Sequence, residues 1–383
     1  MRRGLLLAIV TASIATAPAA GQANRYELTG DRVAIFNPAG EVRLQSGSGS
    51  AVVVEVTPGG ADAADLRFTP RTHDGWNALV VTYPSNDIVY PRLGRFSRTE
   101  MNIDGDGLFG LGSLRASLDE EGYRKSSTIR LSRSQRLRIS GNGGGTEAWA
   151  DLRVIVPAGK TVAINVGAGT VTASNIAGEL RIDSRTGGVE VNSVKGSVYA
   201  NTGSGRISVT NVEGHLLLDT GSGRIDVADA RGGAVRIDTG SGSVVVNDVN
   251  ALGLDIDTGS GSVTVADIVA PALRIDTGSG SIRADRVNAR DLNLDTGSGA
   301  ITLDLVGDVR NALLDTGSGS VTVGVPSALG AEIEIDVGSG GITTDLPIQL
   351  IEKRRNYMRG RLGDGDGRIR IDTGSGGVRL RAR

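Results

Sequence analysis

The sequence predicts an all-β protein: a parallel β-helix (β-solenoid) with 18–20 residues per coil and an irregular β region capping its N-terminal end. Three observations lead to this prediction. A motif based on Asp-Thr-Gly-Ser-Gly recurs at a nearly constant interval, apolar and polar residues alternate between its copies, and many of the 57 glycines keep a fixed phase with that alternation. A period of this length indicates stacked supersecondary units. Right-handed winding is the default expectation.

The chain begins with a segment typical of a cleavable secretory signal. Two arginines follow the first Met, an apolar run covers residues 5–15, and a stretch of small residues ends at Ala23. The apolar run is too short to cross a bilayer. We therefore expect residues 1–23 to be a signal peptide and the mature protein to be soluble. It would lie in the periplasm, at the cell surface or outside the cell.

Cysteine content and charge exclude several other classes of protein. No cysteine is present, so neither a disulfide nor a lipid anchor on an N-terminal cysteine is expected. Without the signal peptide and its two arginines, 39 Lys and Arg stand against 43 Asp and Glu, a net charge of −4. The two signs are interspersed and form no basic stripe, so nucleic acid is not an expected partner.

Residues 24–147 are predicted to form the irregular β region that caps the first coil. Ten of the twelve aromatic residues lie before residue 150. DRVAIFN (31–37) and WNALVVTY (76–83) alternate as strands do, and LQSGSGSAVVVEV (44–56) is a degenerate copy of the repeat corner. A cap is expected because the open end of a solenoid exposes strand edges and core.

Residues 148–383 carry the repeat and are predicted to form the solenoid. The residues that precede the Gly-Ser-Gly corners lie 18 to 21 positions apart, apart from a last step of 36 that contains an insertion at 347–366. Alternation with period two between the corners indicates strands that are buried on one face. The predicted corner ladder consists of Asn165, Asp183, Asn201, Asp219, Asp238, Asp257, Asp276, Asp295, Asp315, Asp336 and Asp372.

We interpret this ladder as structural. Asp and Asn can accept a hydrogen bond from the amide two residues later, and glycine can adopt positive φ. Aspartic proteases also contain Asp-Thr-Gly, but their two carboxylates face each other and share a proton. Here Asn replaces Asp at positions 165 and 201. No catalytic residue, metal or cofactor is therefore expected, although stacked carboxylates repel one another and calcium along the column is an alternative.

Other short motifs are interpreted as loops or surface residues. NIDGDG (102–107) and GDGDG (363–367) resemble the start of an EF-hand loop, but the first lacks the glutamate at loop position twelve. His73 and His215 have no partner in the sequence that indicates catalysis. The insertion is predicted to be a short helix or an edge-covering loop that caps the solenoid. Its alternative role is contact with an anionic surface through Lys353, Arg354, Arg355, Arg359 and Arg361.

The start of the repeat region resembles a known family. WADLRVIVPAGK (149–160) has the V-P-x-G strand opening, and the later corners have the T-x-S-G-x-[IV] form, of the bacterial putative-adhesin family of β-strand-repeat proteins. The resemblance covers about residues 148–383. It implies export and adhesion, and it supplies no catalytic residues. The coil length is also similar to that of bactofilins, which are cytoplasmic and polymerise, so that likeness concerns architecture and possible self-association only.

The sequence therefore predicts an exported, non-enzymatic solenoid: an adhesin-like or cell-envelope scaffold. Outward residues such as Arg236, Asp255, Arg274 and Asn293 would line an extended face that contacts an envelope protein or a polysaccharide. The alternative is a carbohydrate-active enzyme, a polysaccharide lyase or hydrolase, because parallel β-helices host such activities. Short uniform coils leave little room for the cleft that such an enzyme needs.

Overall fold

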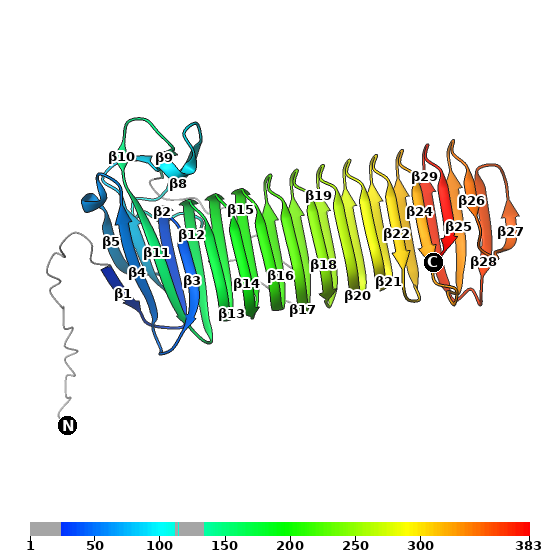
Figure 1. The fold of residues 1–383 in the computed structure, drawn as a ribbon, viewed down its shortest axis with the longest axis horizontal. Helices are drawn as coiled ribbons and strands as arrows, with labels where there is room; N and C mark the ends of the chain where they lie inside the picture. Colours follow the sequence, from blue (N-terminus) through cyan, green and yellow to red (C-terminus); the bar gives the residue numbers. More distant parts are fainter. Residues whose placement is uncertain (1–23, 112–113, 115–133) are drawn as a thin grey trace, which may run out of the picture.

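The protein forms a long parallel β-solenoid with antiparallel strands at both ends (Figure 1). The structure is a computed structural model that describes residues 24–111, 114 and 134–383. It confirms the predicted all-β parallel β-helix, whereas the predicted signal peptide lies outside the described residues. Within these residues, no helix has the length and apolar character needed to span a membrane.

Each coil has two sides, which we call the ladder side and the bend side. β19 (Gly253–Thr258) forms the ladder side of one coil, and the chain then turns through a Gly-Ser-Gly corner. The first part of β20 (Val263–Thr277) forms the bend side, and its second part returns to the ladder side of the next coil. Successive coils pair in parallel, so that Asp257 lies opposite Asp276.

The same path repeats along the chain. The other repeat strands are β12 (Lys160–Ala168), β13 (Val171–Thr186), β14 (Val189–Lys195), β15 (Val198–Ser204), β16 (Ile207–Thr220), β17 (Ile225–Thr239), β18 (Val244–Asn250), β21 (Ile282–Thr296), β22 (Ile301–Leu305), β23 (Asn311–Thr316), β24 (Val321–Val325), β25 (Ala331–Val337), β26 (Ile342–Thr344), β29 (Gly367–Thr373) and β30 (Val378–Ala382). Figure 1 shows these strands side by side along one axis.

One continuous apolar core runs inside the coils. Leu254, Ile256, Val263, Val265 and Ile268 of a single coil are all buried, as the alternation predicts. Each buried aliphatic side chain stabilises the fold by about 1.5–3 kcal/mol. A single coil cannot shield these side chains, so their burial depends on the coils above and below.

In seven consecutive coils, the bend side turns at one residue with a left-handed backbone. These residues have φ between 53° and 59°, a region in which Asn and Asp are enriched among non-glycine residues. The bend therefore needs no glycine. The alternation of apolar and polar residues did not predict this left-handed position. The column consists of Asn175, Ser193, Asn211, Asp229, Asp248, Asp267 and Arg286.

At the N-terminal end, the order of coils in space differs from their order in sequence. β2 (Arg32–Ala39) pairs with β12, and β3 (Val42–Gly47) pairs with β13, both in parallel. Residues 32–47 therefore form a coil in register with the first repeat coil. β3 also pairs with β11 (Trp149–Pro157), which lies one position further out. The solenoid register thus starts inside the region 24–147.

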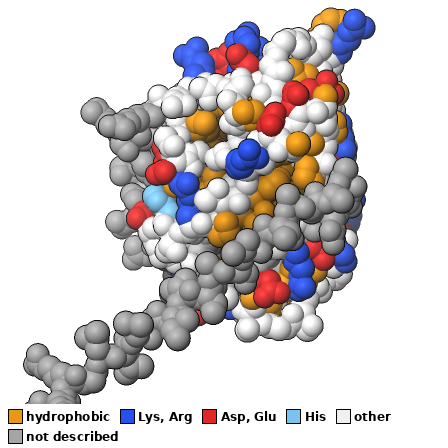
Figure 2. Space-filling model, turned by 90° about the vertical axis from the view of Figure 1, so that its left-hand side faces the viewer, with side chains coloured by type: hydrophobic (Ala, Val, Ile, Leu, Met, Phe, Trp, Pro, Cys, Tyr) orange, Lys and Arg blue, Asp and Glu red, His pale blue; other side chains and the backbone are white. Residues whose placement is uncertain are grey.

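Antiparallel strands close this end. The bend side continues outward through β4 (Val52–Gly59) and β1 (Asn24–Leu28), each antiparallel to the strand before it. The ladder side continues through β6 (Trp76–Thr82), which is parallel to β2, and then β5 (Arg67–His73), which is antiparallel to β6. Figure 2 views this end and shows apolar side chains at its centre with charged side chains around them.

A flap covers the outer face of the first ladder-side strands. We define it as β7 (Asp87–Val89), β8 (Arg98–Ile103), β9 (Gln135–Ser140) and β10 (Thr146–Glu147) together with the loop 104–111. Short 3-10 helices, η1 (Ala63–Asp65) and η2 (Pro91–Leu93), lie in the connections.

Aromatic packing holds the flap in place. Phe109 of its loop packs edge-on against Phe36 of β2, with ring centroids 5.8 Å apart. Because of this cover, β2 is buried on both faces, whereas strands further along are buried on one face only.

At the C-terminal end, the last coil in the sequence lies one position inside the stack. β29 pairs in parallel with both β23 and β25, and β30 pairs with both β24 and β26. The predicted insertion supplies β27 (Gln349–Lys353) and β28 (Tyr357–Leu362), which continue antiparallel outside β25. The alternative of a short helix in this segment is therefore wrong.

Candidate functional site

The corner ladder forms one column on the outward face of the ladder side. Parallel register places each member opposite the next one along the sequence, except at the C-terminal end. There Asp372 lies between Asp315 and Asp336, because its coil is inserted at that position. The column therefore runs without a gap from Asn165 to Asp336.

Threonine, and not aspartate, holds the corner amides. The amide of Gly259, two residues after Asp257, donates to the carbonyl oxygen of Thr239 in the preceding coil (3.1 Å). The amide of Gly261 donates to Oγ1 of Thr258 (3.1 Å), and this hydroxyl donates to the carbonyl oxygen of Gly242 (3.2 Å). The expectation that Asp accepts the amide two residues later is therefore wrong at this corner.

The same pair of threonine hydrogen bonds recurs along the stack. Each hydroxyl is buried, ties its own corner together and links it to the coil below. The place of each threonine, one residue after the ladder Asp or Asn, is a buried phase of the alternation. The other threonines that make both bonds are Thr220, Thr239, Thr277, Thr296, Thr316 and Thr373.

The corner glycines are needed for close approach between coils. A Cβ at Gly261 would lie well under 3.0 Å from the carbonyl oxygen of Gly242, a separation that real Cβ atoms essentially never show. The φ of Gly261 is outside the left-handed region, so the expected positive φ is wrong for this corner. Left-handed φ occurs at the first three corners, at Gly169, Gly187 and Gly205.

We expect Thr258→Val to lower the free energy of unfolding by about 2–4 kcal/mol. Valine has nearly the same shape, but it leaves the amide of Gly261 and the carbonyl of Gly242 unpaired, and each buried unpaired group costs about 1–3 kcal/mol. Thr258→Ser keeps the hydroxyl and should cost less. Denaturant unfolding of both variants tests this, and equal stabilities would contradict the role of the hydroxyl.

The exposed part of the column is strongly acidic. Partial burial raises the pKa of Asp257, and the neighbouring carboxylates of Asp238 and Asp276 raise it further. Burial and its neighbours in the column act in the same direction on the pKa of Asp295. Among the described residues, no three or more His, Asp or Glu side chains are grouped so that they could hold a metal ion.

The remaining motifs form local structure. Oδ1 of Asp104 accepts hydrogen bonds from the amides of Asp106 (2.9 Å) and Leu108 (2.8 Å), so NIDGDG is a turn in the flap loop. Nδ1 of His215 accepts a hydrogen bond from the amide of Ala234 (3.1 Å), one coil away. His73 lies at the end of β5, with Nε2 3.8 Å from a carboxylate oxygen of Asp74.

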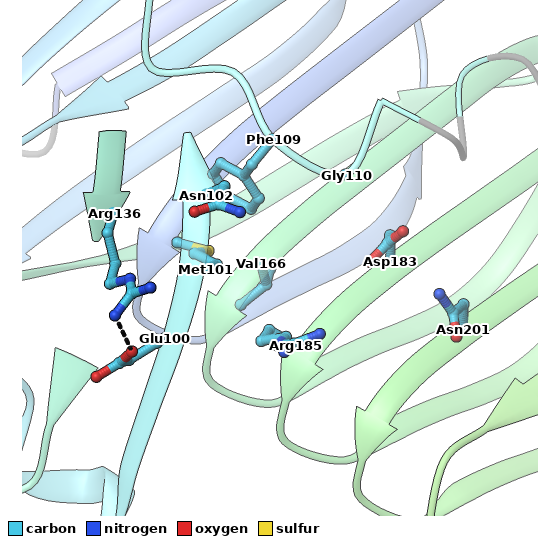
Figure 3. Close-up of a pocket in the computed structure, with 10 residues that line it drawn as sticks. All are labelled: Glu100, Met101, Asn102, Phe109, Gly110, Arg136, Val166, Asp183, Arg185 and Asn201. Atoms are coloured by element: carbon cyan, nitrogen blue, oxygen red, sulfur yellow. Dashed lines mark ion pairs between the residues drawn. The ribbon is translucent and has the colours of Figure 1, made fainter. Parts of the chain in front are cut away.

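A pocket of about 470 Å³ lies where the flap ends against the ladder (Figure 3). Figure 3 shows Asp183 and Asn201 on neighbouring solenoid strands at one wall, while Glu100 and Arg136 of the flap form the other wall. Its lining residues are Glu100, Met101, Asn102, Phe109, Gly110, Arg136, Val166, Asp183, Arg185 and Asn201.

Two features of the chain shape this pocket. A Cβ at Gly110 would lie 2.7 Å from Oδ1 of Asn165 and 3.3 Å from Cγ of Asp183, so glycine lets the flap loop close on the ladder. Arg185 stands two residues after Asp183, where each of the other ten coils has glycine. The one departure from the repeat at this position therefore lies in the pocket wall.

The charges of the pocket are balanced. Burial raises the pKa of Asp183 to about 6, and the nearby carboxylate of Asp219 adds to this, while a hydrogen bond with Asn201 and the charge of Arg185 oppose the increase. On the opposite wall, Glu100 forms ion pairs with Arg136 (3.5 Å) and with Arg98, which stands beside the pocket and not in its lining. The lining thus carries two carboxylates and two guanidinium groups, so it can both donate and accept hydrogen bonds.

We expect Asp183→Asn to be more stable than the wild type at pH 7.5, by about 1–3 kcal/mol. The native carboxyl holds its proton up to about pH 6, but the unfolded one only up to about 3.8. The native state therefore binds more protons between these values, and the wild type is stabilised as pH falls from 7 to 4. The advantage of the variant should then shrink.

Thermal unfolding at pH 7.5 and pH 5 measures this difference. Asp291→Asn is the matched control, since Arg310 lowers the pKa of Asp291 and that variant should be less stable than the wild type at pH 7.5. An unchanged difference between Asp183→Asn and the wild type at the two pH values would show that Asp183 titrates normally.

Three members of the pocket belong to motifs visible in the sequence: Asp183 and Asn201, which were expected only as corner residues, and Asn102, which begins the NIDGDG turn. No sequence pattern connected Glu100 and Arg136 of the flap to this site, because they meet the ladder only in three dimensions. Arg185 was the available signal, since it breaks an otherwise invariant glycine position of the repeat.

Comparison with known proteins agrees with the repeat architecture. Residues 213–381 match the model of the Toastrack family, DUF4097. Among curated proteins, none matches this chain. The structure of a putative cell adhesion protein from Clostridium sporogenes is 8% identical, with 94% of this chain and 100% of that chain covered. The TM-score between the two structures is 0.15.

Proposed function

We propose, from the premise that residues 213–381 belong to the Toastrack family of β-repeat proteins, that this chain is an exported, non-enzymatic, adhesin-like or cell-envelope scaffold. It would present a rigid rod and bind an envelope protein or a polysaccharide. The observation that carries this proposal is the unbroken parallel register of the ladder side from Asn165 to Asp336. Such a stack places outward side chains at a regular spacing of roughly 4.8 Å.

An outward column beside the ladder supports a long contact surface. Arg236, Asp255, Arg274 and Asn293 lie opposite one another in consecutive coils. Both charge signs and an amide alternate along this line, which suits a partner with hydroxyl or mixed polar groups. Quasi-one-dimensional folds use extended faces of this kind for binding.

Expression of residues 1–383 in a Gram-negative bacterium, followed by fractionation and crosslinking in intact cells, tests the proposal. We expect a product that begins near Asn24, lies in the periplasm or at the surface, and is crosslinked to an envelope component. A variant that starts at residue 24 should stay in the cytoplasm and lose these crosslinks. An uncleaved product in the cytoplasm would refute export.

A polysaccharide lyase or hydrolase is the second candidate function. The observation in its favour is the pocket, where the raised pKa of Asp183 lies in the range that suits a general acid. Depolymerisation of a polysaccharide by residues 24–383, lost in Asp183→Asn and kept in Asp257→Asn, would favour the enzyme. Both variants change a ladder aspartate, but only Asp183 lines the pocket.

A further inference from the structure

The pocket between the flap and the ladder has the features of a built ligand site. Its solenoid wall combines the carboxylate of Asp183, the amide of Asn201 and the guanidinium of Arg185. Its volume of about 470 Å³ falls within the range of small-molecule sites, roughly 300–1,000 Å³. The flap wall adds Glu100 and Arg136.

The balance of charge argues for a neutral ligand. An acidic ligand would meet the carboxylates of Asp183 and Glu100, and an amine would meet the guanidinium groups of Arg136 and Arg185. A hydroxyl group both donates and accepts, so it can use a carboxylate, an amide and a guanidinium in turn. A sugar ring carries several neighbouring hydroxyl groups, and these can bond to the carboxylate, the amide and the guanidinium that lie together on the solenoid wall of the pocket.

The apolar part of the lining fits the same kind of ligand. Phe109, Met101 and Val166 border the pocket beside the polar groups. Phe109 is fixed by its contact with Phe36, so this border is held in place by the small core under the flap. A sugar ring has polar edges and faces that carry C–H groups, and it can therefore contact both kinds of lining at once.

We propose that this pocket binds a neutral carbohydrate, as a short segment of a polysaccharide. This inference rests on the proposed function, because it supplies the ligand of a binding protein. It also explains why one coil alone departs from the repeat, since Arg185 places a side chain at the pocket where the other ten coils have none.

Calorimetric titration of residues 24–383 tests the proposal with defined saccharides. The probes are maltose, cellobiose and lactose as neutral disaccharides, with galacturonic acid and glucosamine as charged sugars, followed by an array of bacterial glycans. We expect saturable binding of at least one neutral saccharide. We expect Arg185→Gly, which restores the residue of the other coils, and Asn201→Ala to weaken this binding at least tenfold.

Asp257→Asn is the matched control, because it changes a ladder residue in a regular coil and should leave the affinity unchanged. Thermal unfolding of each variant shows whether a loss of binding reflects a loss of fold. The proposal is overturned if no neutral saccharide binds, if only the charged sugars bind, or if a folded Arg185→Gly protein binds as well as the wild type.

The outcomes for this site and for the proposed function are separable. If the protein binds a neutral saccharide but stays in the cytoplasm, the proposed envelope scaffold is refuted and the proposed carbohydrate site is supported. If the protein is exported but binds no neutral saccharide, the carbohydrate site is refuted and the proposal of an exported scaffold stands. Binding followed by cleavage would keep the site and replace the scaffold with the enzyme.

Discussion

Gly261→Val is expected to lower the free energy of unfolding by about 3–5 kcal/mol, near the upper end of the effects of single substitutions. The new Cβ would overlap the carbonyl oxygen of Gly242, which belongs to the backbone of the coil below. A side chain could move aside, but this carbonyl cannot, because the backbone beneath is held by its own corner. Gly242 itself is packed in the same way on Gly223.

Gly253→Ala is the matched control. A Cβ at Gly253 meets no atom within 4 Å, and its φ lies outside the left-handed region, so alanine should be tolerated there. Denaturant unfolding followed by circular dichroism gives the two stabilities. Similar midpoints for the two variants would mean that neighbouring coils can move apart at the corner. The close contact between Gly261 and the carbonyl oxygen of Gly242 would then not explain why glycine is needed there.

Deleting residues 367–383 should have a still larger effect, a loss of about 6–12 kcal/mol. The deletion removes the buried side chains of Ile369, Ile371, Val378 and Leu380, each of which contributes about 1.5–3 kcal/mol. Because this coil is internal, its removal also leaves the coil of residues 331–344 without its parallel neighbours β29 and β30. The end of the rod should then detach.

Limited proteolysis with mass spectrometry measures this detachment, with cleavage expected between residues 326 and 366. Ile371→Ala tests the same coil without a deletion and should cost about 2–5 kcal/mol. Leu350→Ala on the end strand β27 is the control, since its side chain is 53% exposed and little burial is lost. Protection of residues 331–362 in the shortened chain would show that the outer coil stands without the inner one.

Much of the fold followed from local periodicity. The buried set of Leu254, Ile256 and Val263 could be predicted because period-two alternation and an 18–20-residue repeat leave few other ways to bury these side chains. The order of the coils could not be predicted. The coil that contains Asp372 has the same pattern as its neighbours, so its apolar face fits equally well beside Asp315 or beyond Asp336.

The corner and the pocket show two further limits. The sequence of a corner is compatible with hydrogen bonds from its amides to either the Asp carboxylate or the Thr hydroxyl. Only the structure shows that the buried hydroxyl of Thr258 accepts the bond from Gly261. The pocket combines Glu100 and Asp183, which are far apart in the sequence, and no repeat pattern connects such residues. The sequence did contain one signal for this site: Arg185 replaces the glycine that the other ten coils have at this position. That replacement is informative only once the glycine has been recognised as part of the repeat.

The inserted C-terminal coil has a consequence for biosynthesis. A stack whose neighbours in space were neighbours in sequence could assemble progressively while its chain emerges into the compartment in which it folds. Here β25 and β26 are made before their parallel partners β29 and β30, so a nascent chain cannot complete this end until residues 367–382 have emerged. Until then β23 and β24 present open strand edges to other chains, which makes interrupted translation a specific route to aggregation.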